Sequence, residues 1–257
     1  MSSGEIWIAF YTILRREIRR FMRIWPQTLL PPAITMTLYF AIFGNLIGSR
    51  IGEMGGFTYM QYIVPGLIMM SVITNSYSNV ASSFFSAKFQ HSIQELLVSP
   101  TPNWVVLAGY VLGGVARGLC VGVTVTILSL FFTKLHLHNL LLTVLVVLLT
   151  AIMFALGGFV NALFARSFDD VSIVPTFILT PLTYLGGVFY SISLLPDLWQ
   201  GVSMLNPVLY MVNAFRYGIL GVSDIDVTWA LVIIVAFIVA LSFIGITLLN
   251  RGRGIRS

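Results

Sequence analysis

Arg117 is the residue of this chain whose chemistry is hardest to place. It is the only charge in an apolar run that begins after Glu95 and continues to Thr133. An arginine at mid-membrane costs about 2.5–3.5 kcal/mol on translocon scales, so the position calls for a compensating contact. We expect Arg117 either to face a cavity or an anionic group of a substrate, or to snorkel and bond carbonyls of a neighbouring helix. The sequence leaves both interpretations open.

Motifs for catalysis and nucleotide binding are absent from the sequence. There is no G-x-x-x-x-G-K-[ST] loop to cradle phosphates, and neither H-E-x-x-H nor G-x-S-x-G occurs. No paired carboxylates within an apolar run point to a proton relay. His136 and His138 lie close together, but two histidines are weak support for a metal, and solvation is the better interpretation. The sequence therefore predicts no catalytic residue and no metal site.

The composition of the chain is that of an integral membrane protein. Only 9% of its residues are charged, 58% are hydrophobic and the mean hydropathy is +0.94, whereas about 25% charged residues is usual for soluble domains. A helix needs about 20 apolar residues to cross the hydrocarbon core. We predict an all-α membrane protein, a single transmembrane domain over residues 1–257 with six transmembrane helices. The predicted spans are residues 26–48, 59–83, 103–132, 140–165, 171–190 and 227–250.

Lysine and arginine lie mostly on one side of this six-span pattern. The side that carries both termini would hold Arg15, Arg16, Arg19, Arg20, Arg23, Lys88, Arg166, Arg251, Arg253 and Arg256. The other side would hold Arg50, Lys134 and Arg216. Because cytoplasmic loops are enriched in Lys and Arg, both termini are predicted to be cytoplasmic. Insertion topology thus accounts for the net charge of +5 without a nucleic-acid partner.

The apolar stretch after the fifth predicted span is too interrupted to form a span of its own. Pro196, the Asn206-Pro207 pair and Gly221 divide it into pieces of roughly 10–14 residues, the length expected of re-entrant or interfacial segments. We therefore predict a re-entrant helical hairpin over residues 191–221 rather than a seventh span.

Residues 5–25 predict an amphipathic helix that lies at the membrane interface. Its arginines share one arc at about 100° per residue, and its apolar residues cover the opposite arc. The helix is either a topology anchor attracted to anionic lipid or a contact arm for a cytoplasmic partner. Glu17 falls within the apolar arc, where we expect it to pair with Arg20 one turn on. Alternatively, Glu17 meets a charge from another chain.

The segment between the second and third predicted spans combines polar and aromatic residues. Apolar residues at positions 85, 89, 93, 96 and 97 fit one face of a short helix, and Pro100 and Pro102 stop it. A short helix held between two spans can pass force from a soluble partner into the membrane. The alternative interpretation is an ordinary connecting loop at the interface.

Small residues and prolines predict how two of the spans pack. Gly114, Gly118 and Gly122 recur every four residues and form a smooth ridge, which favours packing within the chain over a dimer seam. Pro175 and Pro181 are expected to kink the fifth span and to free backbone groups that need local partners. Such a kink beside the hairpin is a candidate gating element, although kinks also occur in static bundles.

An ordered set of short motifs carries a family resemblance. The motifs are Glu95-Leu96-Leu97-Val98-Ser99-Pro100, then Pro181, Gly186-Gly187-Val188-Phe189-Tyr190, Leu195-Pro196, Asn206-Pro207, Tyr210 and Arg216. This series resembles the membrane permease subunit of type-2 ATP-binding cassette (ABC) exporters, bacterial permeases paired with a separate ATPase. The similarity covers essentially the whole chain. The closing Arg251-Gly252-Arg253-Gly254 is similar to the tail of one small inner-membrane subgroup.

The resemblance implies a function and a set of partners. Residues 84–98 would be the coupling helix that docks on the ATPase, with the N-terminal helix beside it and the hairpin on the outer face. Two ATPase copies and a second copy of this chain would complete the transporter in the bacterial inner membrane, with membrane lipid around it. The chain itself would hold no cofactor, because ATP and Mg bind to the partner. The cargo would be hydrophobic or lipid-like.

Two sets of residues are candidates for these roles. The candidates for ATPase contact are Phe85, Lys88, Phe89, Gln90, Glu95, Arg16 and Arg20. The candidates for the substrate path or gating are Arg117, Pro181, Asn206, Pro207, Tyr210 and Arg216. An ion-gradient-driven secondary transporter is the alternative, but such proteins usually carry buried acids or repeated halves. An intramembrane enzyme is the second alternative, disfavoured by the missing motifs.

Overall fold

The computed structural model describes residues 2–252, except for the side chains of Asn45, Leu46, Ser49, Glu95 and Leu97. The first half of the chain contains α1 (Ser3–Arg23), α2 (Trp25–Tyr39), the π-helix η1 (Phe40–Ile47), α3 (Gly48–Ile51), the short strands β1 (Glu53–Met54) and β2 (Phe57–Thr58), α4 (Tyr59–Phe89), α5 (Ser92–Val98) and α6 (Asn103–Ser129). The second half contains α7 (Leu140–Phe164), α8 (Phe168–Ile173), the π-helix η2 (Val174–Leu179), α9 (Thr180–Leu185), the 3-10 turn η3 (Ile192–Leu194), α10 (Asp197–Met204), α11 (Pro207–Leu220) and α12 (Val227–Asn250).

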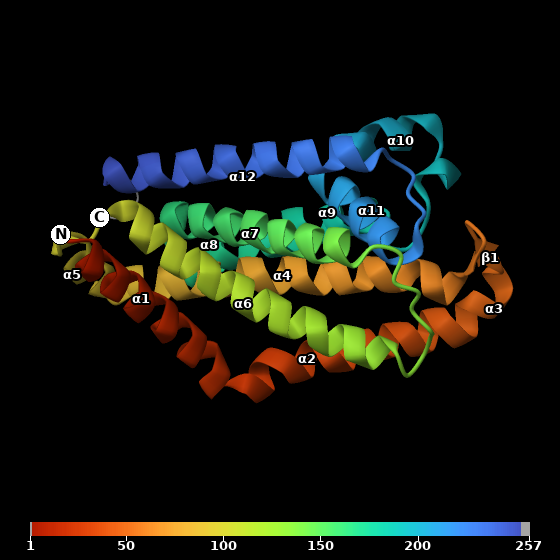
Figure 1. Cartoon of the computed structure of the whole chain (residues 1–257), viewed down its shortest axis with the longest axis horizontal. Helices are drawn as coiled ribbons and strands as arrows, with labels where there is room; N and C mark the ends of the chain where they lie inside the picture. The colour runs from red at the N-terminus through yellow and green to blue at the C-terminus, as the bar shows by residue number, and fades with distance from the viewer. Residues whose placement is uncertain (1, 253–257) are drawn as a thin grey trace.

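The long helices lie side by side as an elongated bundle. α1 begins and α12 ends at one end of the bundle, where α5 also lies, whereas α3, β1 and α10 lie at the other end (Figure 1). We call these the terminal end and the hairpin end. Three of the described helices, α6, α7 and α12, are each long and apolar enough to cross a membrane. The mostly helical fold is thus that of an all-α membrane protein.

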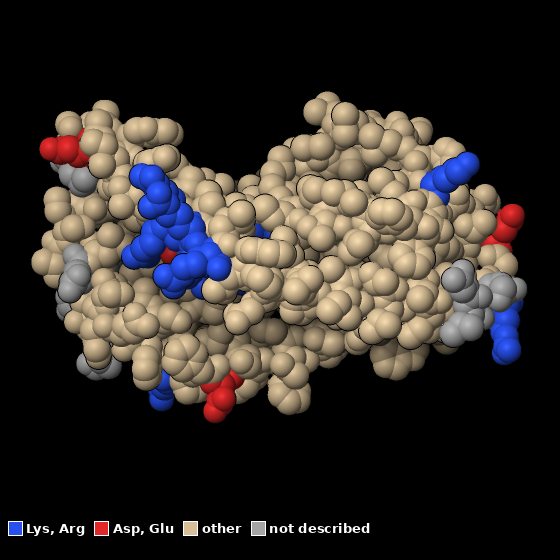
Figure 2. All heavy atoms as spheres, turned by 90° about the horizontal axis from the view of Figure 1, so that it is seen from below, with Lys and Arg blue, Asp and Glu red and all other residues tan. Residues whose placement is uncertain are grey.

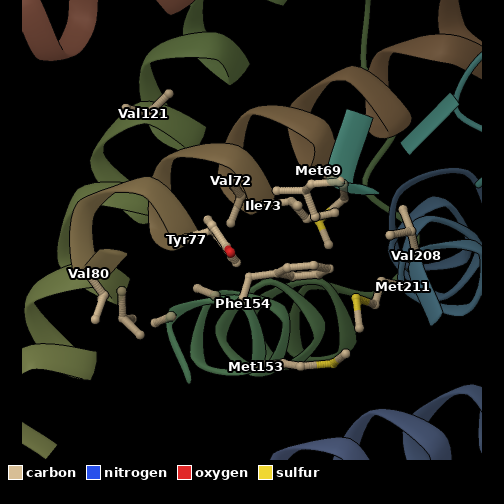
Figure 3. Packing of buried hydrophobic residues seen from close by; sticks show 14 of the residues in the cluster. Met69, Val72, Ile73, Tyr77, Val80, Val121, Met153, Phe154, Val208 and Met211 are labelled. Atoms are coloured by element: carbon tan, nitrogen blue, oxygen red, sulfur yellow. The ribbon is translucent and has the colours of Figure 1, made fainter. Parts of the chain in front are cut away.

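α4 is the central helix of the bundle. Most of its side chains are buried, and it packs against both α6 and α7. Val72, Ile73 and Tyr77 of α4 face Phe154 of α7 in the middle of the core (Figure 3). The capping box of Thr58 and Gln61 begins the helix, which runs without interruption for 31 residues. At about 1.5 Å per residue, α4 therefore connects the two ends over about 46 Å.

Glycines allow α4 and α6 to approach closely. A Cβ atom at Gly114 would lie 2.9 Å from the carbonyl oxygen of Ser76, and one at Gly122 would lie 2.7 Å from Val72. At Gly118, an added Cβ would collide with the Ser76 hydroxyl. All three glycines of the ridge thus serve packing within the chain, which confirms the preferred interpretation of their spacing.

The α-helical pattern is interrupted around Pro175 and Pro181. The π-helix η2 joins α8 to α9 there, and the Thr180 hydroxyl donates a hydrogen bond of 2.9 Å to the carbonyl oxygen of Pro175. Pro175 lacks the N–H that would bond the carbonyl of Val171 one turn earlier, and the side-chain amide of Asn161 on α7 donates to this carbonyl at 3.2 Å. The π-helix at Pro175 and the partner of the Val171 carbonyl agree with the expected interruption of the span and its freed backbone groups.

The expected helix over residues 84–98 is divided in two. Phe84 to Phe89 form the last turns of α4, and α5 begins only at Ser92. The break falls at His91, whose φ of 58° lies in the left-handed region that ends helices. The sequence predicted one helix because the apolar residues continue at helical spacing across the break, where α4 and α5 each bury one side against the same core. Within residues 84–98, the prediction of one helix is therefore wrong, and α5 is the only separate short helix.

Candidate functional site

A buried acid organises the terminal end of the bundle. Glu17 of α1 is only 1% exposed, and it accepts a hydrogen bond of 2.5 Å from the hydroxyl of Ser83 on α4. The Nε of Arg20 lies 3.5 Å from the same carboxylate, which confirms the expected pair one turn apart. Gly113 of α6 makes room for Glu17, since an added Cβ would lie 2.5 Å from the Glu17 Cβ. The carboxylate thereby joins α1 to α4 where α6 covers it.

Arg16 and Arg20 fasten α1 to its neighbours on the same turn. The Arg16 guanidinium donates to the phenol oxygen of Tyr110 on α6 and lies over the Tyr110 ring. The Arg20 guanidinium donates to the backbone oxygen of Asn79 at 3.0 Å and to the side-chain oxygen of Asn79 at 2.8 Å. Both arginines were candidates for ATPase contact, and the structure gives each a partner within the chain.

A basic groove opens between α1, the end of α4 and the start of α5. It has a volume of about 960 Å³. Its basic lining consists of Arg15, Arg16, Arg19, Arg20 and Arg23. Among the described residues, Glu17 is the only acid in this lining, so the groove carries a large excess of positive charge. Figure 2 shows this gathering of basic side chains on one face of the molecule.

Arg117 lies on the face of α6 that packs against α1. Gly109 contacts Ile13 and Gly113 contacts Glu17, and Arg117 follows one turn further along the same face. It is close enough to Arg20 for their charges to interact. Its Nε is buried and makes no hydrogen bond within the described part of the chain. Arg117 therefore adds a further cation with a free donor beside the basic groove.

Lys88 caps a helix instead of facing outward. Its ammonium donates to the carbonyl oxygens of Leu163 at 2.9 Å and Ala165 at 2.7 Å, at the end of α7. A cation is favoured there, because the last carbonyls of a helix carry a partial negative charge. Burial lowers the pKa of Lys88, and the nearby charge of Arg166 lowers it further. The side chain thus ties the end of α4 to the end of α7.

Aromatic side chains form the outermost surface beside this cap. Phe85 is buried and packs edge-on against Phe168, whose ring also contacts Phe89. Phe89 is 60% exposed and Phe168 is 52% exposed, and Gln90 is exposed beside them. Phe89 and Gln90 are thus exposed candidates for ATPase contact, as is Arg16, whose side chain is 49% exposed. The side chain of Glu95, another candidate, lies outside the described residues.

A second polar cluster lies at the hairpin end of α4. Its centre is Arg216 of α11, which is fully buried although the sequence placed it among the outer charges. Its guanidinium donates to the carbonyl oxygens of Gly187 at 2.6 Å and Tyr62 at 3.3 Å, and to the side-chain oxygen of Asn213 at 3.4 Å. It also lies 4.0 Å from the centroid of the Tyr62 ring. Burial is possible because each donor group meets an acceptor.

Asp224 completes the cluster from the segment that follows α11. Its carboxylate accepts hydrogen bonds from the Ser191 hydroxyl at 2.7 Å, the backbone N–H of Ile192 at 3.0 Å and the Tyr62 hydroxyl at 3.4 Å. Its own N–H donates to Asn213 at 3.0 Å. Sequence reasoning missed Tyr62, Asn213 and Asp224. The one available signal was Asn213, a polar residue one helical turn before Arg216.

The remaining candidates fix the hairpin. Asn206 accepts from the N–H of Val208 at 3.0 Å and donates to the carbonyl of Leu182 at 2.6 Å, which places the turn between α10 and α11 at Asn206 and Pro207. The Tyr210 hydroxyl donates to the carbonyl of Met204 at 2.7 Å. Pro181 lies exposed at the first turns of α9. Arg216 thus lies at the hairpin end with Asn206, Pro207 and Tyr210 on the same hairpin, whereas Arg117 lies in the middle of α6, close to Arg20.

Comparison with known proteins assigns this architecture to a family. The model of the family described as "ABC-2 type transporter" matches residues 8–220. The chain therefore belongs to the ABC-2 type transporter family, as its motifs suggested. It is a membrane permease subunit, a non-catalytic component without a cofactor, and permeases of this family pair with ATPase subunits that bind the ATP.

Individual relatives extend this comparison over almost the whole chain. The chain is 62% identical to the inner membrane transport permease YadH of Escherichia coli K12, over 98% of each chain. It is 22% identical to nodulation protein J of Neorhizobium galegae, over 95% of this chain and 93% of that protein. It is 21% identical to nodulation protein J of Rhizobium leguminosarum bv. viciae, over 97% of this chain and 96% of that one. The permease is thus a protein of the inner membrane.

Proposed function

We propose that this permease exports a hydrophobic or lipid-like substrate across the bacterial inner membrane. Two copies of the chain form the translocation path, and two copies of a separate ATPase supply the energy. ATP binding closes the ATPase pair, moves the two coupling helices together and rearranges the membrane halves so that cargo is released outward. The chain performs no chemistry in this alternating-access cycle.

The proposed topology has six membrane-spanning segments and both termini in the cytoplasm. The crossings are α2 with η1, then α4, α6, α7, α8 with η2 and α9, and finally α12. The terminal end carries the basic groove, which supports a cytoplasmic location through the enrichment of Lys and Arg on that side. The hairpin of α10 and α11 then lies at the outer face and dips back toward α4, α7 and α12.

The observation that carries this proposal is the continuity of α4. Its terminal end leads directly into α5 and the exposed Phe89, where an ATPase would dock. Its hairpin end is fixed to Arg216 through the carbonyl of Tyr62. A displacement imposed on α5 is therefore transmitted along one continuous helix to the hairpin. The cap that Lys88 makes on α7 extends the same displacement to a second helix.

The candidate residues take separate roles in this mechanism. Phe89 and Gln90 form the exposed part of the ATPase contact, with Glu95 on α5 beside them. Arg16 and Arg20 hold α1 in place next to that contact. Pro181, Asn206, Pro207, Tyr210 and Arg216 position the gate at the outer face. Arg117, the remaining candidate, lies on the face of α6 that packs against α1, close to Arg20.

Co-expression with an ABC-type ATPase tests the proposal. We expect the ATPase to co-purify with the permease and to gain ATPase activity, and we expect Phe89→Ala to weaken both effects. Phe243→Ala is the matched control, because Phe243 is 72% exposed on α12, away from the contact. Light scattering of the complex should give two permeases and two ATPases. Transport in vesicles that follows a proton or sodium gradient without ATP would establish a secondary transporter instead.

A further inference from the structure

An apolar cleft lies beside the bend between α1 and α2. It has a volume of about 390 Å³ and lies between this bend and the middle of α6. Phe21 and Trp25 line one side, and Cys120 and Val123 line the other. Val123 is 60% exposed and Trp25 is 54% exposed, so the cleft opens at the surface of the protein. Its apolar lining suits a hydrocarbon chain.

The cleft and the basic groove adjoin each other along α1 and α6. On α1, Arg20 lines the groove and the next residue, Phe21, lines the cleft. On α6, Arg117 lies one helical turn before Cys120, which lines the cleft, and it is close enough to the guanidinium of Arg20 for their charges to interact. A ligand with its tail in the cleft would therefore place its head beside two arginines.

Unused hydrogen-bond donors gather at this junction. The Nε of Arg117 and the side-chain nitrogen of Asn79 are buried, and neither makes a hydrogen bond within the described residues, whereas the Nε of Arg20 faces the Glu17 carboxylate at 3.5 Å. Asn79 is fully buried, and its side-chain oxygen already accepts from Arg20. Buried donors without acceptors are costly, and an anion with several oxygens satisfies more than one of them. The junction is thus short of acceptors and negative charge.

We propose that this junction binds an anionic glycerophospholipid of the inner leaflet. The phosphate lies between Arg20 and Arg117, and an acyl chain lies in the cleft between Trp25 and Val123. Arg117 is then neither unpaired nor part of the translocation path, because its counter-ion is the lipid phosphate. The site needs the cytoplasmic orientation of α1 proposed above, but it needs neither an ATPase nor transport.

Depth in the membrane favours a lipid over a segment of a soluble partner. Cys120 lies about 25 Å along α6 from Asn103, at a rise of about 1.5 Å per residue. A soluble ATPase can reach the mouth of the groove but not a cleft at that depth. A glycerophospholipid carries both a phosphate and a chain that extends into the hydrocarbon core. It therefore matches the charged mouth and the apolar interior together.

Cys120 supplies a reporter for occupancy of the cleft. It is the single cysteine of the chain, it is exposed, and it lines the cleft. The purified permease, without ATPase, is titrated in detergent with phosphatidylglycerol or phosphatidylcholine of the same chains, and the rate of maleimide labelling of Cys120 is measured. We expect phosphatidylglycerol to protect Cys120 at concentrations about tenfold lower than phosphatidylcholine, since one charge-assisted contact contributes a factor of this order.

Variants separate the head-group site from the cleft. Arg117→Gln and Arg20→Gln should each remove most of the preference for phosphatidylglycerol, whereas Arg166→Gln, an exposed arginine at the same end, should retain it. Val123→Trp should fill the cleft and reduce the phosphatidylglycerol retained after purification, as measured by native mass spectrometry. Val239→Trp on α12 is the matched control, because Val239 is 63% exposed and lies outside the cleft.

Four outcomes would overturn the proposal. Equal protection by the two lipids, or a preference that survives both arginine variants, would show that these arginines do not bind a phosphate. Protection by inorganic phosphate at the same concentration would indicate a site for a free anion instead of a lipid. Loss of the bound lipid when the ATPase docks would assign the groove to the partner. Size-exclusion profiles of the variants distinguish each of these results from misfolding.

Discussion

The arginines at the two ends of α4 differ in how completely the chain pairs them. At the hairpin end, Arg216 is fully buried and donates to two carbonyls and an amide oxygen while it stacks on Tyr62. At the terminal end, five arginines line an open groove with one acid, and Arg117 keeps a free donor beside it. The first cluster is complete within the chain, whereas the second has more donors and charge than its own acceptors satisfy.

This difference indicates which cluster is structural and which awaits a ligand. A buried guanidinium is tolerated when each of its donors meets an acceptor, and it then fixes the segments that supply those acceptors. Arg216 fixes α4, the segment around Gly187 and α11 in this way. An excess of partly exposed cations does not fix a structure, because it leaves charge for an outside partner. We therefore infer that the hairpin end is a clamp and propose that the terminal end is a binding surface.

Removal of Arg216 should have the largest effect on stability. Arg216→Met leaves the carbonyl of Gly187 without its donor and removes the further bonds to Tyr62 and Asn213, so we expect the free energy of unfolding to fall by about 3 kcal/mol or more. Thermal unfolding of the purified permease in detergent measures this loss. The free energy of unfolding of Arg216→Lys should lie between those of Arg216→Met and the wild type, because lysine keeps the charge but cannot reach several acceptors at once. Arg216→Met as stable as the wild type would contradict the assignment as a clamp.

The second-largest loss of stability is expected at the close contact between Gly66 of α4 and Val188, next to Gly187, whose carbonyl bonds Arg216. A Cβ at Gly66 would lie 2.7 Å from the carbonyl oxygen of Val188 and 2.8 Å from its Cα, and neither backbone atom can rotate away. We expect Gly66→Ala to lower the free energy of unfolding by about 1–3 kcal/mol. Gly157→Ala is the control, since its added Cβ would meet the Tyr77 ring at an ordinary 3.6 Å. Thermal unfolding that ranks the two variants equally would show that the hairpin end is not tightly packed.

Lys88 tests the division of roles at the terminal end. Lys88→Gln removes the charged cap from the carbonyls of Leu163 and Ala165, and we expect a loss of about 1 kcal/mol in the free energy of unfolding. Because the ammonium is committed within the chain, co-purification of the ATPase should stay close to that of the wild type. Lys88→Arg should recover most of the stability. A stable Lys88→Gln variant that fails to retain the ATPase would instead make Lys88 a direct contact with the partner.

The sequence predicted the all-α membrane class and the small-residue packing, because both depend on local pattern. Charge-poor runs located the long apolar helices, and the four-residue spacing of Gly114, Gly118 and Gly122 predicted their contact with α4. The pair of Glu17 and Arg20 followed from helical spacing alone. Each of these inferences needed only residues within one element or one run.

The sequence could not show contacts between distant segments. The break at His91 was hidden because apolar residues continue at helical spacing across it. The burial of Arg216 depends on carbonyls of Tyr62 and Gly187, which the fold alone brings to it. Lys88 likewise caps a helix end that lies more than seventy residues further along the chain. A carbonyl acceptor has no signature in a sequence, since every residue carries one.

The smallest expected effect is a pH dependence at the start of α8, beside the exposed aromatic surface. Backbone N–H groups of Arg166 and Ser167 donate to Asp170 at 2.8 and 3.1 Å and hold its pKa below the ordinary value of 3.8. A depressed carboxylate pKa contributes stability that is present above 3.8 and is lost as the pH falls through the folded-state pKa. Hydrogen exchange at Arg166 and Ser167 should therefore become faster, relative to neighbouring amides, as the pH falls below 3.8. Asp170→Asn should remove this dependence, and a wild-type profile in that variant would assign it to another group.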